Sequence, residues 1–220
     1  TVRLLVVPHW VSIEPEVAER LRRYVEEGGV LLVGARTGTR DAQNQVVSQT
    51  PPGLLSELFG VTVEEYGKVT SHPDRILLEE GGSIPLQSWY EVLEAHGADV
   101  VGTWECEHYH GLPALTMRRL GKGRAYYRGT YLNEEVFAGL LDRLAGDAGL
   151  HPLIEGLPEA VEAVERTDGQ RSLLFLLNHG GEVITVPGVP NGLDLLTDTP
   201  VRGSEISLEP FGVAILRVGA

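Results

Sequence analysis

The sequence predicts an α/β domain with a mainly parallel sheet, followed by a small all-β sandwich domain. Near the N-terminus, an apolar strand, an amphipathic helix and a second apolar strand follow one another over residues 3–33, the pattern of a βαβ unit. Beyond residue 150, short β-type segments separated by turn residues replace the helical periodicity. We therefore expect an α/β domain over residues 1–150, a linker over 151–158 and an antiparallel β-sandwich over 159–220.

The βαβ unit is predicted from apolar runs and helix signals. The strand expected over residues 3–7 carries a continuous apolar run at 4–7 that Pro8 stops, which is typical of a buried parallel strand. Ser12 is the expected N-cap of the following helix, and Gly28 offers a left-handed C-cap. The apolar residues of this helix recur at helical spacing: Val17, Leu21, Tyr24 and Val25. Residues 30–33 then give the second buried strand.

The rest of the first domain is predicted from shorter signals. A polar loop over residues 36–49 precedes a short helix at 54–59 and strands at 61–64 and 100–104. Residues 115–128 read as a β-hairpin, because Gly121 and Gly123 supply the positive φ of a tight turn. A last helix is expected to start at the N-cap Asn133 and to end at Gly146 and Gly149. Its expected buried residues are Val136, Phe137, Leu140, Leu141 and Leu144.

The second domain is predicted as all-β because no useful helical period follows His151. Turn residues separate its short apolar segments at the spacing of a sandwich. The expected strands are residues 161–164, 172–177, 183–186, 192–196, 205–208 and 213–218.

Composition excludes several classes of partner. The net charge is −13, which argues against nucleic acid and anionic membranes, since both bind basic surfaces. No apolar run approaches the roughly 20 residues that a membrane-spanning helix needs, and no secretory signal is evident. Cys106 is the only cysteine, so an internal disulfide is impossible and a reducing compartment, the cytoplasm, is expected.

One cluster carries metal-ligand chemistry. On a strand, alternation would place Cys106, His108 and His110 on one face, and a thiolate with two imidazoles suits zinc or copper. Glu105 and Glu107 would then lie on the other face. Alternate residues of a flat strand lie roughly 6–7 Å apart, so three ligands could close on one ion only at a bend. Surface or interface residues are the favoured interpretation, and we predict neither a metal nor a cofactor.

Other possible sites have simpler explanations. Paired carboxylates at residues 26–27 and 79–80 abut Gly-Gly and are expected in solvent. The Gly-Lys-Gly at 121–123 lies between two strands, so a hairpin turn is favoured over a phosphate loop. His179 is expected to hold sandwich backbone or an interdomain contact. Six aromatic residues could form a sugar platform or a protein interface: Trp89, Tyr90, Trp104, Tyr109, Tyr126 and Tyr127.

Several segments carry a resemblance to a known family. They are Gly-Leu-Pro-Ala-Leu-Thr at 111–116, Gly-Lys-Gly-Arg-Ala-Tyr-Tyr at 121–127, Gly-Ala-Arg-Thr-Gly at 34–38 and, in the second half, residues 175–179, 194–197 and 208–213. Together they resemble the two C-terminal domains of the glycoside hydrolase family 42 β-galactosidases. Residues 1–150 resemble the trimerisation domain, which implies a flavodoxin-like fold related to class I glutamine amidotransferases. Residues 159–220 resemble the small C-terminal β-sandwich.

The resemblance also implies a function for the parent enzyme. Such an enzyme hydrolyses terminal non-reducing β-D-galactose residues with retention, using two carboxyl groups on a catalytic barrel that would lie upstream of Thr1. No residue here inherits a catalytic role, so we expect the chain to be inactive alone. An earlier strand and helix precede residues 4–7 in the family, so we also expect a domain truncated before Thr1.

The expected role of the chain is assembly. The resemblance implies a homotrimer, contact with the missing barrel and walling of the active-site clefts, where β-galactoside binds only to the parent. The hairpin region and the loop over residues 34–50 are the candidate subunit contacts.

Two alternatives remain at this point. One is a stand-alone carbohydrate-binding module that uses the sandwich and exposed aromatic residues. The other is an amidotransferase-like regulatory module with a small-molecule site at the carboxyl ends of the parallel strands, near Pro8 and Gly34. Catalytic amidotransferase chemistry is disfavoured, because the turn after Val33 carries no cysteine nucleophile.

Overall fold

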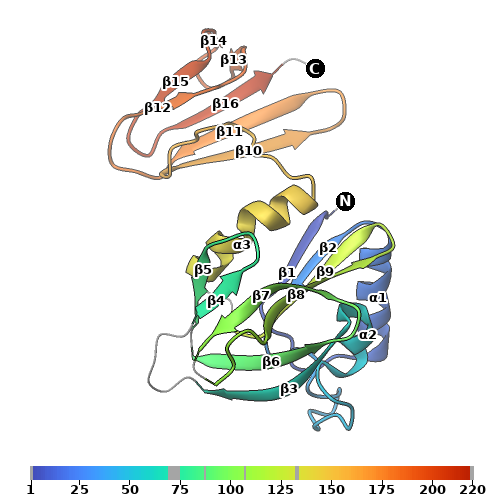
Figure 1. Cartoon of the computed structure of the whole chain (residues 1–220). Helices are drawn as coiled ribbons and strands as arrows, with labels where there is room; N and C mark the ends of the chain where they lie inside the picture. Colours follow the sequence, from blue (N-terminus) through green and yellow to red (C-terminus); the bar gives the residue numbers. More distant parts are fainter. Residues whose placement is uncertain (1, 69–74, 87, 107, 132–133, 219–220) are drawn as a thin grey trace. The chain divides into compact units, whose positions relative to one another are not determined.

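The computed structural model describes residues 2–68, 75–86, 88–106, 108–131 and 134–218 (Figure 1). The chain divides into two compact units, Thr1–Leu150 and His151–Ala220, named here unit 1 and unit 2. Within the described ranges, no helix has the length and apolar character needed to cross a membrane.

Unit 1 is built on a seven-stranded mixed sheet with the strand order β1-β2-β9-β8-β7-β4-β5. Only the β1–β2 and β2–β9 pairings are parallel, and the remaining pairings are antiparallel. The strands are β1 (Leu4–Val7), β2 (Val30–Val33), β4 (Arg75–Leu78), β5 (Ser83–Pro85), β7 (Asp99–Glu105), β8 (Pro113–Leu120) and β9 (Gly123–Arg128).

The predicted flavodoxin-like, class I glutamine amidotransferase-like α/β domain with a mainly parallel sheet is therefore wrong. Each added parallel strand needs a crossover, usually a helix. After β2 the chain instead returns through antiparallel pairs, so β7, β8 and β9 form a meander. Strands dominate the described chain, which contains only three short α-helices: α1 (Pro15–Glu26), α2 (Ser56–Phe59) and α3 (Glu134–Asp147). The amidotransferase-like alternative loses its structural basis.

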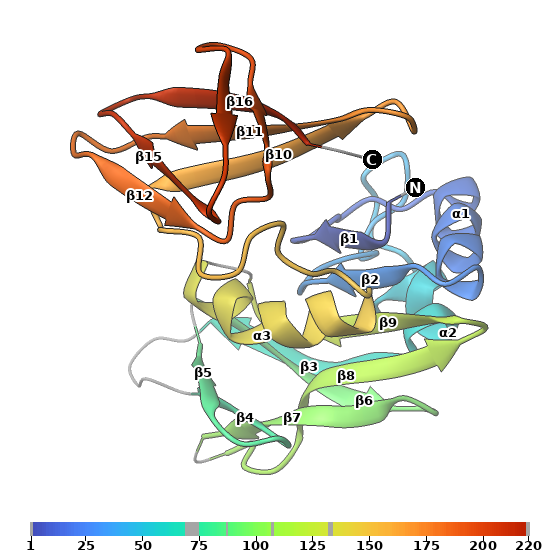
Figure 2. The ribbon, with the colours of Figure 1, turned by 90° about the horizontal axis from the view of Figure 1, so that it is seen from above.

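Both faces of the central sheet are buried. On β2, Val30 and Leu32 pack into one apolar cluster, whereas Leu31 and Val33 pack into the other. Helix α1 contributes Leu21 and Val25 to the second cluster, and α3 contributes Leu140 and Leu144 to the first. Figure 2 shows α1 and α3 lying along different sides of this sheet. The continuous apolar run of β2 follows from its burial on both faces.

Several local predictions for the helices need correction. The N-cap of α1 is Glu14, with Pro15 at the first helical position, and Ser12 instead forms a β-bridge with Arg40. Leu141, predicted to be buried, is 41% exposed. The predicted cap Asn133 and the side chain of Val136 lie outside the described residues.

A two-stranded antiparallel sheet completes unit 1. It pairs β3 (Val61–Lys68) with β6 (Trp89–Ala95) and contains a register shift between Val63 and Glu65. The strand predicted at 61–64 continues to Lys68, and β6 was not predicted at all. A β-bridge between Tyr90 and Thr130 also joins β6 to the chain just after β9, which brings β6 beside the end of a parallel strand.

Unit 2 is all-β and its two layers are unequal. A five-stranded antiparallel sheet, β10-β11-β16-β13-β14, packs one face against a two-stranded sheet, β12-β15. The strands are β10 (Val161–Thr167), β11 (Ser172–Asn178), β12 (Ile184–Pro187), β13 (Gly192–Asp194), β14 (Thr199–Val201), β15 (Glu205–Leu208) and β16 (Val213–Val218). The predicted sandwich is confirmed only in part, because its second layer covers only part of the larger sheet.

Candidate functional site

The carboxyl ends of the parallel strands define one edge of unit 1. Pro8 follows β1, Gly34 follows β2 and Gly129 follows β9. A Cβ atom on residue 34 would lie 1.9 Å from the Pro8 carbonyl oxygen, so only glycine lets the two strand ends approach this closely. The backbone leaving β2 is thereby held against β1.

Glu91 anchors the loop that follows Gly34. Its side chain is 2% exposed and extends from β6 towards that loop. Its Oε1 accepts hydrogen bonds from the Arg36 backbone N–H at 2.8 Å and the Trp89 Nε1–H at 3.3 Å, and its Oε2 accepts one from the Tyr127 hydroxyl at 2.9 Å. Burial raises the pKa of Glu91, although the three donors and the Arg36 charge oppose the shift.

An aromatic row lies beside this carboxylate. It consists of Tyr66, Trp89, Tyr131 and His9. The ring centroids of Tyr66 and Trp89 are 5.4 Å apart with planes at 19°, and those of Trp89 and Tyr131 are 6.1 Å apart. The Arg36 guanidinium carbon lies 5.2 Å from the Trp89 centroid, and its Nη1 donates to the Tyr131 hydroxyl at 3.3 Å. Tyr66, 62% exposed, is the solvent end of this row.

The aromatic row borders a pocket of about 270 Å³. Its polar lining includes Arg36, Arg40 and Glu91, and its apolar lining includes Trp89 and Tyr66. A flat aromatic surface beside cationic and carboxylate groups can bind a ligand that has an apolar face and several hydroxyl groups. The volume lies just below the roughly 300 Å³ at which small-molecule pockets typically begin, so only a small ligand would fit.

Arg128, at the end of β9, is the least expected residue of this edge. It is fully buried, and none of its three guanidinium nitrogens has a hydrogen-bond partner among the described residues. Burial lowers the pKa of Arg128 to about 9. Its Nη2 lies 3.2 Å from where a Cβ on residue 34 would be, so the guanidinium occupies space next to Gly34.

The Cys106, His108 and His110 cluster does not lie on a strand. Strand β7 ends at Glu105, and residues 108–110 form a turn closed by a hydrogen bond from the Gly111 N–H to the Trp104 carbonyl at 3.0 Å. Cys106 is half-buried against the core, whereas His108 and His110 are exposed. Among the residues described, no group of three potential ligands could hold a metal ion. Glu107 lies outside the described residues.

The predicted aromatic platform is only partly at this edge. Trp104, Tyr126 and Tyr127 are buried in the core. Tyr90 and Tyr109 pair with each other at 5.2 Å. Of the six predicted residues, only Trp89 belongs to the aromatic row; sequence reasoning missed Tyr66, Tyr131, His9 and the anchor Glu91.

The remaining candidates have ordinary structural positions. Glu26, Glu27, Glu79 and Glu80 are exposed. The Gly121-Lys122 pair forms the turn of the β8–β9 hairpin. His179 is exposed, with its Nε2 3.0 Å from the Glu162 Oε2.

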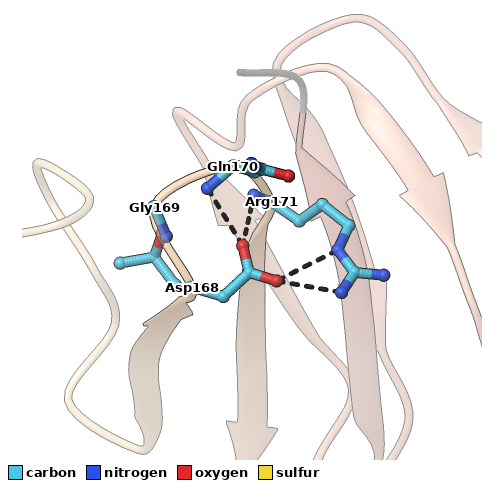
Figure 3. Close-up of polar contacts among 5 residues, drawn as sticks. Asp168, Gly169, Gln170 and Arg171 are labelled. Carbon is cyan, nitrogen blue, oxygen red and sulfur yellow. Dashed lines mark hydrogen bonds and ion pairs between the residues drawn. The ribbon is translucent and has the colours of Figure 1, made fainter.

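Unit 2 has a basic pocket at one end of its larger sheet. The Asp168 carboxylate accepts hydrogen bonds from the backbone N–H groups of Gln170 and Arg171 at 2.9 and 2.8 Å, and from the Arg171 guanidinium at 2.9 and 3.1 Å (Figure 3). These donors lower the pKa of Asp168. The turn fixes Arg171 at the rim of a pocket of about 470 Å³ that Arg166 and Arg217 also line.

Comparison with known proteins gives matches over nearly the whole chain. A family model described as the β-galactosidase trimerisation domain matches residues 1–151, and one described as the β-galactosidase C-terminal domain matches residues 160–218. The β-galactosidase Pbg of Clostridium perfringens is 30% identical over 98% of this chain, and BglY of Alicyclobacillus acidocaldarius is 30% identical over 97%. Each match covers 32% of the relative, so the chain spans about a third of the length of these curated relatives.

Solved structures give the same result. The β-galactosidase from Bacillus circulans sp. alkalophilus superimposes with a TM-score of 0.91 at 28% identity, over 99% of this chain and 33% of that one. The cold-adapted β-galactosidase of a Rahnella species superimposes with a TM-score of 0.85 at 26% identity, over 98% and 32%. Both units of the chain are thus similar to the same part of longer enzymes.

Proposed function

Since the chain belongs to the glycoside hydrolase family 42 β-galactosidases and corresponds to a C-terminal part of such an enzyme, we propose that it is the non-catalytic region that assembles the enzyme and walls its active sites. The observation that carries this proposal is that unit 1 matches the trimerisation-domain family model and unit 2 matches the C-terminal-domain family model, in that order. The activity of the longer enzyme would be hydrolysis of terminal β-D-galactose residues.

The chemistry of the candidate site supports a non-catalytic role. A retaining glycosidase needs two carboxyl groups about 5–5.5 Å apart, one of them acting as a nucleophile. Glu91 is the buried carboxylate of the candidate site, and three donors of the fold occupy its oxygens. A carboxylate held in this way cannot approach an anomeric carbon. In this proposal the two catalytic carboxyl groups belong to the part of the enzyme that the chain does not match.

The edge of unit 1 supports the assembly role. The Arg40 N–H donates to the Val11 carbonyl at 3.0 Å, and the Val47 N–H donates to the Thr39 carbonyl at 3.2 Å, so the loop after Gly34 is fixed at several points. Exposed apolar side chains lie on or beside this ordered loop: Trp10 at 42%, Val46 at 73% and Leu54 at 38%. A preorganised surface loses little conformational entropy when a subunit docks on it. We propose the loop over residues 34–50 and the β8–β9 hairpin as the subunit contacts of a trimer. With Cys106 as the only cysteine, the proposed location is the cytoplasm.

Sedimentation velocity and a galactosidase assay on the purified chain test this proposal together. We expect a self-associated species and no hydrolysis of a chromogenic β-galactoside. Val46→Asp should weaken the association, whereas Val183→Asp, at an exposed position of unit 2, should not. Turnover that survives further purification would contradict the non-catalytic role, and association unaffected by Val46→Asp would contradict the assigned contact.

The pocket beside the aromatic row favours a second candidate, carbohydrate binding. Trp89 and Tyr66 present aromatic surface next to Arg36 and Arg40, which can hydrogen-bond to hydroxyl groups. Isothermal titration calorimetry with galactose and lactose tests it. Saturable heat that Trp89→Ala abolishes would support binding, and flat heats would reject it.

A further inference from the structure

The five-stranded sheet of unit 2 has a second apolar face. Here it is called the outer face, defined by the side chains that alternate away from the buried cluster of unit 2. On β11 these are Leu173, Phe175 and Leu177, all half-buried, whereas Leu174 and Leu176 point into the cluster. The outer face also includes Val164 on β10, Val213 and Ile215 on β16, and Leu193 and Leu195 at β13.

No described element of unit 2 covers the outer face. The two-stranded sheet β12-β15 packs on the opposite face, through Val186 and Leu208. None of the outer apolar residues joins any of the three buried clusters. Val213 is 45% exposed and Leu195 is 42% exposed. A contiguous apolar sheet face of this kind marks an interaction surface rather than ordinary solvent-exposed surface.

Along β10, this apolar centre has a positively charged residue at one end and a negatively charged residue at the other. The strand register places Val164, Phe175 and Ile215 in one cross-strand row. The next row on the same face, two residues away in one direction, is Arg166, Leu173 and Arg217. The next row in the other direction is Glu162, Leu177 and Val213. Within the described part of unit 2, neither Arg166 nor Arg217 forms a salt bridge. At the β10 edge, the outer face is therefore basic at Arg166, apolar at Val164 and acidic at Glu162.

We propose that unit 2 binds a second copy of itself, face to face, about a two-fold axis that runs along the Val164–Phe175–Ile215 row. This rotation reverses the strand direction, so it sets Arg166 of each copy over Glu162 of the other and forms two such pairs. It stacks Phe175 on Phe175 and Leu173 on Leu177, which makes the surface self-complementary, as a two-fold interface requires. Two twisted sheets pack in this aligned way about 10 Å apart. Arg217 faces Val213 of the copy and can extend its guanidinium to water at the rim.

Like charges exclude the other aligned two-fold arrangement. An axis parallel to the strands and centred on β11 would exchange β10 with β16, so Arg166 of one copy would face Arg217 of the other and Glu162 would face only Val213. The axis along the row instead joins opposite charges at the edge of an apolar contact, where partial desolvation strengthens them. His179, whose Nε2 lies 3.0 Å from the Glu162 Oε2, holds that carboxylate beside the end of β11.

This inference is independent of the trimer contacts proposed for unit 1. If unit 1 forms trimers, the two-fold contact of unit 2 joins two trimers. If unit 1 does not, it joins two single chains. Loss of the two-fold contact halves the mass of the assembly in either case, so failure of one proposal is distinguishable from failure of the other.

A charge-swap series on the complete chain tests the inference. Sedimentation velocity is recorded over a concentration series from low micromolar to hundreds of micromolar. Arg166→Glu should weaken the two-fold association about tenfold or more, because the introduced carboxylate then faces Glu162 of the copy. The double variant Glu162→Arg with Arg166→Glu should restore it, because the pair is again complementary. Rescue is specific to self-association, since an unrelated partner surface would oppose both swapped charges.

Two further variants keep the result interpretable. Arg202→Glu makes the same charge change at an exposed position outside the outer face and should leave the association unchanged. Phe175→Thr removes the apolar centre and should halve the mass, with an unchanged circular dichroism spectrum as the check on folding. The inference is overturned if the wild-type mass does not depend on the outer-face substitutions or if the double swap fails to rescue. It is equally overturned if the outer face gains protection from hydrogen exchange only when a longer polypeptide is joined to the chain.

Discussion

The hydroxyl of Tyr127 donates a hydrogen bond to the Glu91 carboxylate at 2.9 Å, and both side chains are withdrawn from solvent. Tyr127 is the penultimate residue of β9 in the seven-stranded sheet, and Glu91 belongs to the separate two-stranded sheet, 36 residues earlier in the chain. Because Glu91 also accepts from the Arg36 N–H, one carboxylate joins both sheets of unit 1 to the loop after β2. The proposed subunit contact therefore depends on a buried ionisable group.

Glu91→Gln should remove a pH dependence of stability. Burial raises the pKa of Glu91 above that of an exposed glutamate. Its contribution to stability is then complete below the unfolded pKa and is lost as the pH rises through the folded pKa. We expect the stability of wild type relative to Glu91→Gln to fall from acidic to neutral pH, measured by urea unfolding across that range. Glu64→Gln, at an exposed carboxylate, should show no such trend, and a difference that grows with pH would contradict the burial argument.

Tyr127→Phe should destabilise unit 1 without changing its core volume. The substitution leaves the Glu91 Oε2 buried without its donor, and such a loss typically costs about 1–3 kcal/mol. Tyr66→Phe, at a largely exposed hydroxyl, should be close to neutral. Equilibrium denaturation measures both variants. The double variant with Glu91→Gln should cost less than the sum of the single changes, because the two residues share one contact.

Arg128→Met should stabilise the protein at neutral pH. The guanidinium is buried with no partner among the described residues, and burial lowers its pKa to about 9. Apolar replacement of a buried charge can yield about 1–4 kcal/mol. A depressed folded pKa makes wild-type stability rise with pH from about 9 upward. The advantage of the variant should therefore shrink at alkaline pH in thermal melts. Arg119→Met, at an exposed arginine of β8, is the control, and a destabilised Arg128→Met would show that the guanidinium has a partner.

Strand pairings between neighbours in the chain could be predicted from the sequence. The β1-α1-β2 unit and the β8–β9 hairpin were predicted because a crossover helix and a two-glycine turn are local signals. The sheet as a whole was predicted wrongly, because strand direction after β2 depends on connections that leave no local periodicity. The family resemblance implied the same flavodoxin-like fold class, so it could not correct this error.

The candidate site was missed for a related reason. Strand β6 carries Glu91 and Glu94 among apolar residues, a pattern that disfavours a buried strand. Glu91 is tolerated inside because its donors come from Arg36 and Tyr127, 55 and 36 residues away. Charge at a buried position is interpretable only when its partners are known. Arg128 was overlooked similarly, since an arginine at the end of a strand ordinarily reaches solvent.

Gly34→Ala should destabilise unit 1, although its backbone needs no positive φ. A Cβ at this position would lie 1.9 Å from the Pro8 carbonyl oxygen, a backbone atom that can move only if β1 and β2 separate. We expect a loss of roughly 1–3 kcal/mol, as for overpacking elsewhere. Gly146→Ala is the matched control, because a Cβ there meets nothing within 4 Å and the residue lies in α3. It should instead stabilise by about 0.5–1 kcal/mol through helix propensity. Urea unfolding of both variants measures the contrast, and equal effects of one sign would show that the strand ends are not packed this tightly.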